Sequence, residues 1–252
     1  DQTEDDSKET EVKHQGMLLV DATVAPSDIR YPTDLGLLNE GREISERIID
    51  TLYEPSPAKV KPRTYRRKAR KAYLSVAKKR RKSVKDIRRG IKAQLAYLGR
   101  NLRTIDRLLD EHSELCPLSY KDQRKLWIIR ELYRQQEEMY RTKSKRIDGR
   151  IVSISQPHVR PIVRGKAGAK VEFGAKISAS VVGGNVFLDR LGWDAYNESA
   201  DIPTQVENYR ERFGCYPEVL ISDTIYGTRD NRRYLKKHGI RYSGTALGRP
   251  SK

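Results

Sequence analysis

Two short apolar segments, each followed at once by an aspartate, constrain the fold of this chain more than any other feature of its sequence. Residues 17–20 (Met-Leu-Leu-Val) lead into Asp21, and residues 219–222 (Val-Leu-Ile-Ser) lead into Asp223. Short apolar runs with polar flanks are typical of strands buried inside a sheet. We therefore expect two core strands, each ending in a carboxylate that the rigid sheet can direct into a cleft.

The segment after residue 147 alternates between predicted strands and predicted helices. Gly183-Gly184 followed by Asn185 indicates a hairpin turn, and Asp201 is expected to cap a helix that Gly214 ends. A strand, a helix and a strand with short connections predict a parallel βαβ unit, whose reactive crevice lies at the carboxyl ends of its strands. The expected strands are 150–155, 170–182, 186–188, 219–222 and 240–242, and the expected helices are 201–213 and 229–238.

The segment at 34–146 is predicted to be helical. Apolar residues recur every three or four positions through 84–109, and a second stripe follows at 126–140 after a break at 115–119. This spacing places the apolar side chains on one face of each helix. Two long amphipathic helices joined by a short turn favour an antiparallel hairpin, and a shorter helix is expected at 43–52. The simplest role of these stripes is to pack against one another.

Composition divides the chain into four stretches. Residues 1–16 are rich in acidic residues and nearly free of apolar ones, as expected of a solvated linker. Residues 17–33 hold the first strand, residues 34–146 form a basic helical insertion, and residues 147–252 complete the part built from strands and helices. We therefore expect an α/β fold with a mixed sheet and flanking helices, interrupted by a long helical hairpin.

The net charge indicates a polyanionic partner. The chain has 51 Lys and Arg against 34 Asp and Glu, a formal charge of +17, and such an excess attracts nucleic acid. Residues 61–85 contain thirteen Lys or Arg and no acid, among them Arg66, Arg67 and Lys68. Carboxylates are the ligands that Mg²⁺ prefers, and Mg²⁺ keeps positions open for phosphate oxygens. We therefore expect a divalent cation and a nucleic acid to meet on this molecule.

Other ligand classes find less support. No apolar run approaches the roughly 18 residues of a membrane span, so we expect no membrane partner. The two cysteines and four histidines have no spacing typical of a metal site. Few cysteines without motif spacing are typical of a reduced, cytoplasmic protein.

Two blocks around the aspartates carry a family resemblance. They are residues 19–26 (Leu-Val-Asp-Ala-Thr-Val-Ala-Pro), continued by 28–35, and residues 221–227 (Ile-Ser-Asp-Thr-Ile-Tyr-Gly). These resemble the first and second catalytic blocks of bacterial insertion-sequence DDE transposases, most nearly the IS-five-like group. Residues 160–166 and 171–176 also fit this pattern, and the resemblance covers most of the chain after the acidic stretch.

The resemblance implies an RNase H-like catalytic core that carries two aspartates and one glutamate and works on DNA ends with Mg²⁺, for which Mn²⁺ can substitute. Asp21 and Asp223 match the two aspartates, so we expect both to be catalytic and to bind the metal. The implied reaction is cleavage and strand transfer of double-stranded DNA at insertion-sequence ends. Transposases of this type act as homo-oligomers, in the bacterial cytoplasm at the nucleoid.

Two features depart from the family pattern. The second block usually reads Asp, any residue, Gly, Tyr, whereas here Gly227 lies four residues after Asp223. The family's glutamate lies on a helix well beyond the second aspartate, and no residue up to Lys252 matches it. We therefore expect the third acid beyond Lys252, and this chain to be a fragment with an incomplete active site. Glu172 lies on an expected strand between the two aspartates and is interpreted as structural or DNA-facing.

Two sets of cations are interpreted as DNA contacts. One comprises Arg160, Arg164 and Lys166, for which a charged surface loop is the alternative interpretation. The other comprises Arg66, Arg67 and Lys68 in the basic block, for which a solvated helix face or a nuclear-type signal is the alternative interpretation. Contacts of this kind hold the DNA backbone and carry no sequence specificity.

A different class of protein would explain the charge equally well, namely a non-catalytic nucleic-acid-binding protein. A single aspartate at the end of a strand is common as a turn or helix cap. The binding-protein hypothesis leaves two such acids in a basic molecule without a reason. Metal binding distinguishes the transposase hypothesis from the binding-protein hypothesis, because a non-catalytic binding protein should not bind or require Mg²⁺. A decayed transposase would share the fold and lack the activity.

Overall fold

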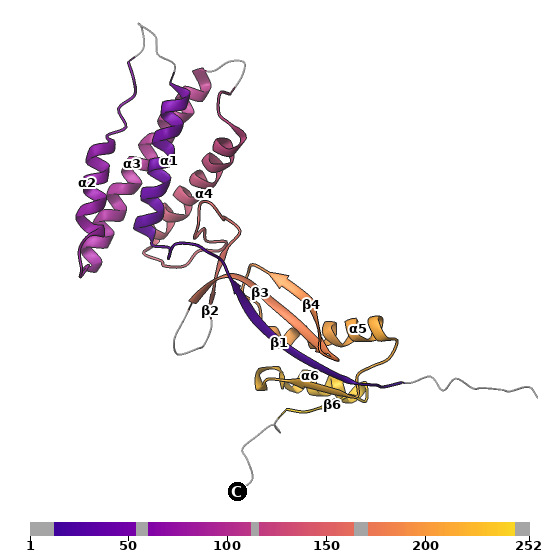
Figure 1. Ribbon diagram of the computed structural model, residues 1–252. Helices are drawn as coiled ribbons and strands as arrows, with labels where there is room; N and C mark the ends of the chain where they lie inside the picture. Colours follow the sequence, from indigo (N-terminus) through magenta and orange to yellow (C-terminus); the bar gives the residue numbers. More distant parts are fainter. Residues whose placement is uncertain (1–12, 54–59, 112–115, 164–170, 245–252) are drawn as a thin grey trace, which may run out of the picture. The chain divides into compact units, whose positions relative to one another are not determined.

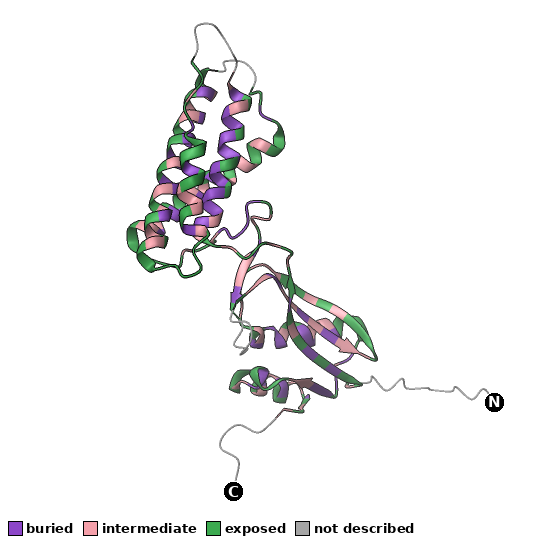
Figure 2. Cartoon of the chain, turned by 60° about the vertical axis from the view of Figure 1, so that its left-hand side comes forward, coloured by how far each residue is buried: buried purple, intermediate pink, exposed green. Residues whose placement is uncertain are grey.

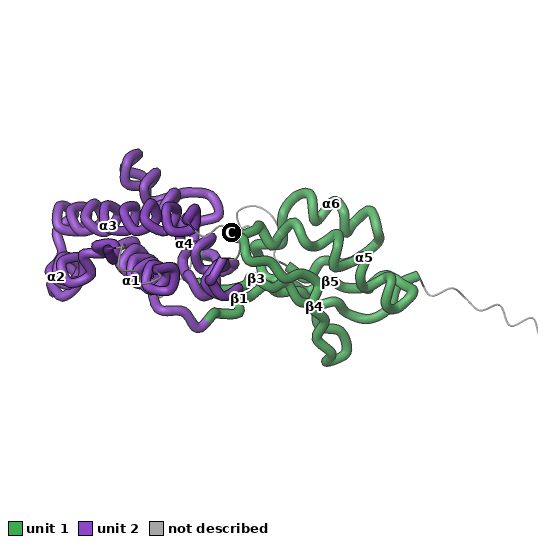
Figure 3. The backbone as a smooth tube through the Cα atoms, turned by 90° about the horizontal axis from the view of Figure 1, so that it is seen from above, with its two compact units in different colours: residues 1–27, 161–252 green, residues 28–160 purple. Residues whose placement is uncertain are grey.

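The chain folds as two compact units (Figure 3). The sheet unit comprises residues 1–27 and 161–252, and the helical unit comprises residues 28–160. The expected combination of a mixed sheet with helices is confirmed at this level. The computed structural model describes residues 13–53, 60–111, 116–163 and 171–244 (Figure 1).

One mixed sheet forms the frame of the sheet unit. Its strands are β1 (Met17–Pro26), β2 (Arg160–Val163), β3 (Val171–Val182), β4 (Asn185–Gly192), β5 (Val219–Ser222) and β6 (Arg241–Tyr242). β1 is central, because it pairs with β3 in antiparallel and with β5 in parallel orientation. β6 continues the parallel side, and β4 returns along β3. The turn between β3 and β4 has positive φ at Gly183 and Gly184, a conformation that glycine adopts freely.

Two helices cover the core of the sheet unit. They are α5 (Ile202–Phe213) and α6 (Arg229–Lys237), and the short 3-10 helices η1 (Glu198–Asp201) and η2 (Thr224–Tyr226) accompany them. Gly214 ends α5 with a φ of +73°, as expected from the sequence. Figure 2 shows the buried residues of these elements. The core consists of Leu18, Val20, Ile202, Val206, Tyr209, Cys215, Leu220, Tyr226, Leu235 and Ile240.

Two expectations for the sheet unit are corrected. β1 does not end at Asp21 but continues to Pro26, because β3 pairs with it as far as Gly174. Asp201 precedes α5 as expected, but its side chain makes no capping hydrogen bond. Its carboxylate instead accepts a hydrogen bond from Ser178 Oγ at 2.5 Å and pairs with Arg190 at 2.8 Å. The orientation of the Asp201 side chain is therefore set by residues distant in sequence and not by the helix that it precedes.

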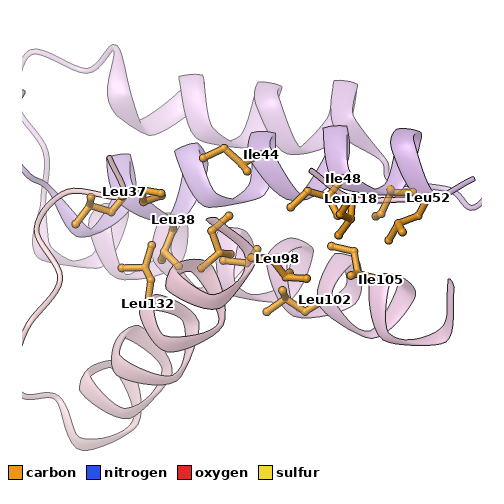
Figure 4. Close-up of a cluster of buried hydrophobic side chains, with 14 of the residues drawn as sticks. Leu37, Leu38, Ile44, Ile48, Leu52, Leu98, Leu102, Ile105, Leu118 and Leu132 are labelled. Atoms are coloured by element: carbon orange, nitrogen blue, oxygen red, sulfur yellow. The ribbon is translucent and has the colours of Figure 1, made fainter. Parts of the chain in front are cut away.

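The described part of the helical unit contains the helices α1 (Asp34–Leu52), α2 (Arg66–Ala77), α3 (Val84–Glu111) and α4 (Tyr120–Thr142). The two long helices predicted from the apolar stripes are thereby confirmed as α3 and α4. Ser119 caps α4 by accepting a hydrogen bond from Asp122 N at 3.2 Å. α1 packs against both long helices, and the side chains between them form the core shown in Figure 4. No helix in the described residues is long and apolar enough to span a membrane.

Two expectations for the helical unit are corrected. α1 begins at Asp34 rather than residue 43, because Thr33 caps it by accepting a hydrogen bond from Gly36 N. The strand expected at 150–155 is wrong, since the structure has no strand there. Ile151 and Ile154 are instead buried in the helical core. Residues 28–33 and 147–160, grouped with the strands by composition, belong to the helical unit.

Candidate functional site

The two aspartates hold equivalent positions on neighbouring parallel strands. The parallel pairing of β1 with β5 ends at Val20 and Ser222. Asp21 and Asp223 are the next residues in sequence, Asp21 within β1 and Asp223 directly after β5. Neighbouring strands lie about 4.8 Å apart. β5 ends at this level whereas β1 continues, which leaves a notch in the sheet beside the second half of β1.

A pocket of about 610 Å³ occupies this notch, and both aspartates line it. β1 contributes one wall, and β3 and the segment that leads into η1 contribute others. The lining residues are Asp21, Ala22, Thr23, Val24, Ile162, Val163, Lys176, Tyr196, Asn197, Glu198, Asp223 and Ile225. Both carboxylates thus line one pocket, as the sequence predicted, although Asp21 lies within β1 and not at its carboxyl end.

Both carboxylates are exposed and are oriented by their own backbone. Asp21 Oδ1 accepts a hydrogen bond from Ala22 N at 2.8 Å. Asp223 Oδ1 accepts from Thr224 N at 2.5 Å, which caps the short helix η2. Within the described residues neither carboxylate has an ion pair. Each therefore keeps oxygen lone pairs available for a ligand in the pocket.

A lysine and a glutamate of the same pocket were missed by sequence reasoning. Lys176 Nζ lies 2.6 Å from Glu198 Oε2, and the lysine side chain is only 14% exposed. It also donates a hydrogen bond to the carbonyl oxygen of Tyr196 at 2.8 Å. The pair joins β3 to η1 and so fixes one wall of the pocket. No local pattern marks this pair, since its members are 22 positions apart and lie on different elements.

Tyr226 lies in the core beside this site. Its side chain is buried, and within the described residues its hydroxyl has no hydrogen-bond partner. Burial raises the pKa of the Tyr226 phenol well above its ordinary value of 10, and the carboxylates of Glu198 and Asp21 raise it further. The phenol therefore stays protonated at any pH at which the protein would work.

The donor set of the pocket suits Mg²⁺, which usually takes one or two carboxylates and completes its shell with water and phosphate oxygens. Asp21 and Asp223 would supply the carboxylates. Glu198 lies in the same pocket but is paired with Lys176. In the described part of the chain, no group of three or more His, Cys, Asp or Glu side chains is placed to hold a metal ion. Two protein ligands are therefore what this geometry offers.

The residues expected to contact DNA fall in different places. Arg160 begins β2, and its guanidinium donates to the carbonyl oxygens of Pro157 and Val159. Arg164 and Lys166 lie outside the described residues. These contacts of Arg160 favour a role in fixing the local turn.

The second set lies at the start of α2 in the helical unit, and its members differ from one another. Arg66 donates to both carboxylate oxygens of Asp50, at 3.0 and 2.9 Å. Arg67 and Lys68 are exposed. Arg66 is therefore already paired, whereas its two neighbours face solvent.

Comparisons of the chain with protein-family models, with curated proteins and with solved structures found no match. The geometry of the pocket and the chemistry of its residues are therefore the basis for a function.

Proposed function

We propose that the chain is the catalytic part of a DDE-type transposase, which cleaves and transfers strands of double-stranded DNA with the help of Mg²⁺. The observation that carries this proposal is the register of β1 and β5, which gives Asp21 and Asp223 equivalent positions at one pocket. An acid that merely caps a turn has no need of a second acid beside it. Two exposed carboxylates in a molecule of charge +17 are more simply explained by a shared cation.

The topology supports an RNase H-like interpretation of the sheet unit. A central strand with antiparallel neighbours on one side and parallel neighbours on the other is the mixed sheet that the resemblance implies. The first aspartate lies on the central strand, and the second follows the adjacent parallel strand. Ligands of open α/β sheets bind at the carboxyl ends of such strands.

The proposed chemistry assigns separate roles to the residues of the pocket. Asp21 and Asp223 would hold the cation through the oxygens that their local hydrogen bonds leave available. Bound Mg²⁺ would activate a water molecule or a DNA 3′-hydroxyl as the attacking group and would stabilise the leaving oxygen. Lys176 and Glu198 would keep the opposite wall in place through their ion pair. The excess positive charge of the chain would draw DNA towards the site.

Nicking of supercoiled plasmid in the presence of Mn²⁺ tests this function. We expect the wild-type chain to nick slowly and only with metal, because among the described residues its pocket offers two unpaired carboxylates and not the three that the resemblance implies. Asp21→Asn or Asp223→Asn should reduce this rate roughly 10²-fold or more, because each variant removes a ligand charge. DNA binding, measured in EDTA, should be unchanged in both variants.

Asp230→Asn is the matched control. Asp230 is an exposed acid of the same unit, paired with Arg233 in the first turn of α6, and it does not line the pocket. We expect this variant to nick DNA at the wild-type rate. Nicking that survives in both pocket variants would contradict the proposal. DNA binding with neither nicking nor carboxylate-dependent binding of Mn²⁺ would assign the chain to the non-catalytic binding proteins.

A further inference from the structure

We propose that helix α2 of the helical unit is a docking surface for the phosphate backbone of double-stranded DNA. The surface consists of Arg67, Arg70, Lys71 and Lys78, and we call it the α2 basic face. The inference concerns the helical unit alone and does not depend on catalysis in the sheet unit.

The spacing of these cations places them on one side of the helix. At 100° per residue, positions 67, 70, 71 and 78 fall within a sector of about 100°. The opposite side holds Ala69 and Val76, which are buried at 0% and 2% exposure. Gln94 of α3 donates a hydrogen bond to the carbonyl oxygen of Ala69 at 3.0 Å. α2 is therefore attached to the helical unit by its apolar side and presents its cations to solvent.

The α2 basic face lines a hollow of about 520 Å³. Leu74 and Ser75 line it together with Arg67, Arg70, Lys71 and Lys78. Eleven residues of helix separate Arg67 from Lys78, which corresponds to roughly 16 Å along the axis. A straight row of cations of that length matches several consecutive phosphates of a duplex, whose backbone charge is evenly spaced.

The charges of this face are not balanced within the molecule. Three other cations of the basic block are engaged, since Lys61 and Arg66 pair with Asp50 and Lys79 pairs with Asp86. Among the described residues, none of the four cations of the α2 basic face has an ion pair. Four uncompensated charges on three helical turns repel one another, and a polyanion relieves that repulsion. Arg66, by contrast, already pairs with Asp50 and so links α2 to α1.

Aromatic side chains near the surface argue for a duplex rather than a single strand. Single strands are bound largely by stacking bases on exposed aromatic rings. The ring of Tyr65 is occupied by cations, with Arg100 Cζ at 4.7 Å and Lys68 Nζ at 6.0 Å from its centre. Tyr73 is half-buried and lines a different pocket. In the described part of α2 no ring is left free for a base, so phosphate contacts dominate.

Fluorescence anisotropy of short duplexes, titrated against salt in EDTA, tests the proposal with the full chain. We expect wild type to bind two unrelated sequences equally. Replacing Arg67, Arg70, Lys71 and Lys78 together by Gln should flatten the slope of log affinity against log salt by about three to four units. Affinity at about 0.1 M salt should fall by roughly two to three orders of magnitude. EDTA removes the metal, so failure of the nuclease proposal would leave this result unaffected.

A variant of equal charge provides the control. Arg103, Lys121, Arg124 and Arg141 are exposed cations on α3 and α4 of the same unit, and their joint replacement by Gln removes the same charge. We expect its slope to change by less than one unit. An equal loss in both variants would show that net charge alone matters and would overturn the proposal, as would tighter binding of a single strand than of the duplex. If the fourfold α2 variant fails to fold, the four single variants decide, each with an expected loss of about 0.9 unit.

Discussion

At the scale of single residues, close backbone contacts and single charges set the limits on what can be changed near the candidate site. At Gly174 the backbones of β1 and β3 leave no room for a side chain, since a Cβ atom there would lie 2.0 Å from the carbonyl oxygen of Ala25. The neighbouring part of β1 forms a wall of the pocket. The absence of a side chain at Gly174 therefore allows β3 to approach β1 closely beside the pocket.

Gly174→Ala should destabilise the sheet unit by about 1–3 kcal/mol, because the two strands must separate to admit the methyl group. Urea unfolding followed by circular dichroism measures the change. Gly192→Ala on β4 is the matched control, since its Cβ would have ordinary contacts of 3.5 Å with Tyr196. A loss in Gly174→Ala no greater than in this control would show that the strand contact is loose.

Asp50 makes the stability of the helical unit depend on pH. Burial opposes ionisation of Asp50, but hydrogen bonds from Lys61 and Arg66 outweigh it and hold its pKa below the ordinary value of 3.8. The unfolded chain therefore binds this proton more readily than the folded chain, so the contribution is present above about pH 4 and is lost as the pH falls through the lower, folded pKa.

Asp50→Asn should accordingly reduce stability at pH 7 by up to about 1 kcal/mol, the usual range for a partly exposed pair. Thermal unfolding of both proteins between pH 7 and pH 3 checks this. The difference between them should shrink as the pH falls below about 4. A difference that stays constant over this range would mean that the ion pair does not stabilise the unit.

At the scale of helices and strands, the sequence predicted the elements whose signal is local. It did not predict features that depend on contacts between distant segments. The stripes of α3 and α4 are visible in the sequence because one amphipathic helix carries its whole signal within itself. The strands that bear the aspartates were equally accessible, since short apolar runs mark them. The segment at 150–155 was mistaken for a strand because its apolar residues resemble a strand pattern, whereas Ile151 and Ile154 are buried against helices and the segment pairs with no strand.

The residues of the candidate site also differ in whether the sequence could reveal them. Asp21 and Asp223 could be found because each follows an apolar strand, whereas the pairing of Lys176 with Glu198 depends on how η1 packs against β3. The role of Arg42 was equally hidden in the sequence. This buried arginine of α1 donates a hydrogen bond to Gln94 of α3. Contacts between distant segments leave no periodic trace in a single sequence.

The core between α1, α3 and α4 should respond strongly to truncation. Leu98 is fully buried on α3, so Leu98→Ala should cost about 2–5 kcal/mol through lost burial and the cavity that remains. Val84→Ala on the same helix is the control, because Val84 is 83% exposed and its truncation should change stability by about 0.5 kcal/mol or less. Chemical denaturation measures both. Similar losses in the two variants would contradict the packing shown in Figure 4.

At the scale of the whole molecule, the chain is divided into a sheet unit with the carboxylate pocket and a helical unit with the α2 basic face. The first strand of the sheet unit precedes the helical unit in sequence, and the rest of the sheet follows it. Insertion between β1 and the remaining strands lets one chain carry two surfaces of different chemistry. The acidic pocket suits a cation, and the basic helix suits phosphate.

The central claim is that Asp21 and Asp223 bind one cation together, and titration of Mn²⁺ followed by electron paramagnetic resonance tests it most directly. We predict one Mn²⁺ in the wild-type chain, displaced by Mg²⁺, and binding weakened at least about tenfold by either Asp21→Asn or Asp223→Asn. Either single variant should weaken the same binding event, since both carboxylates act on one ion. Unchanged affinity in either single variant, or a wild-type chain with separate Mn²⁺ sites of which each variant abolishes a different one, would contradict the account.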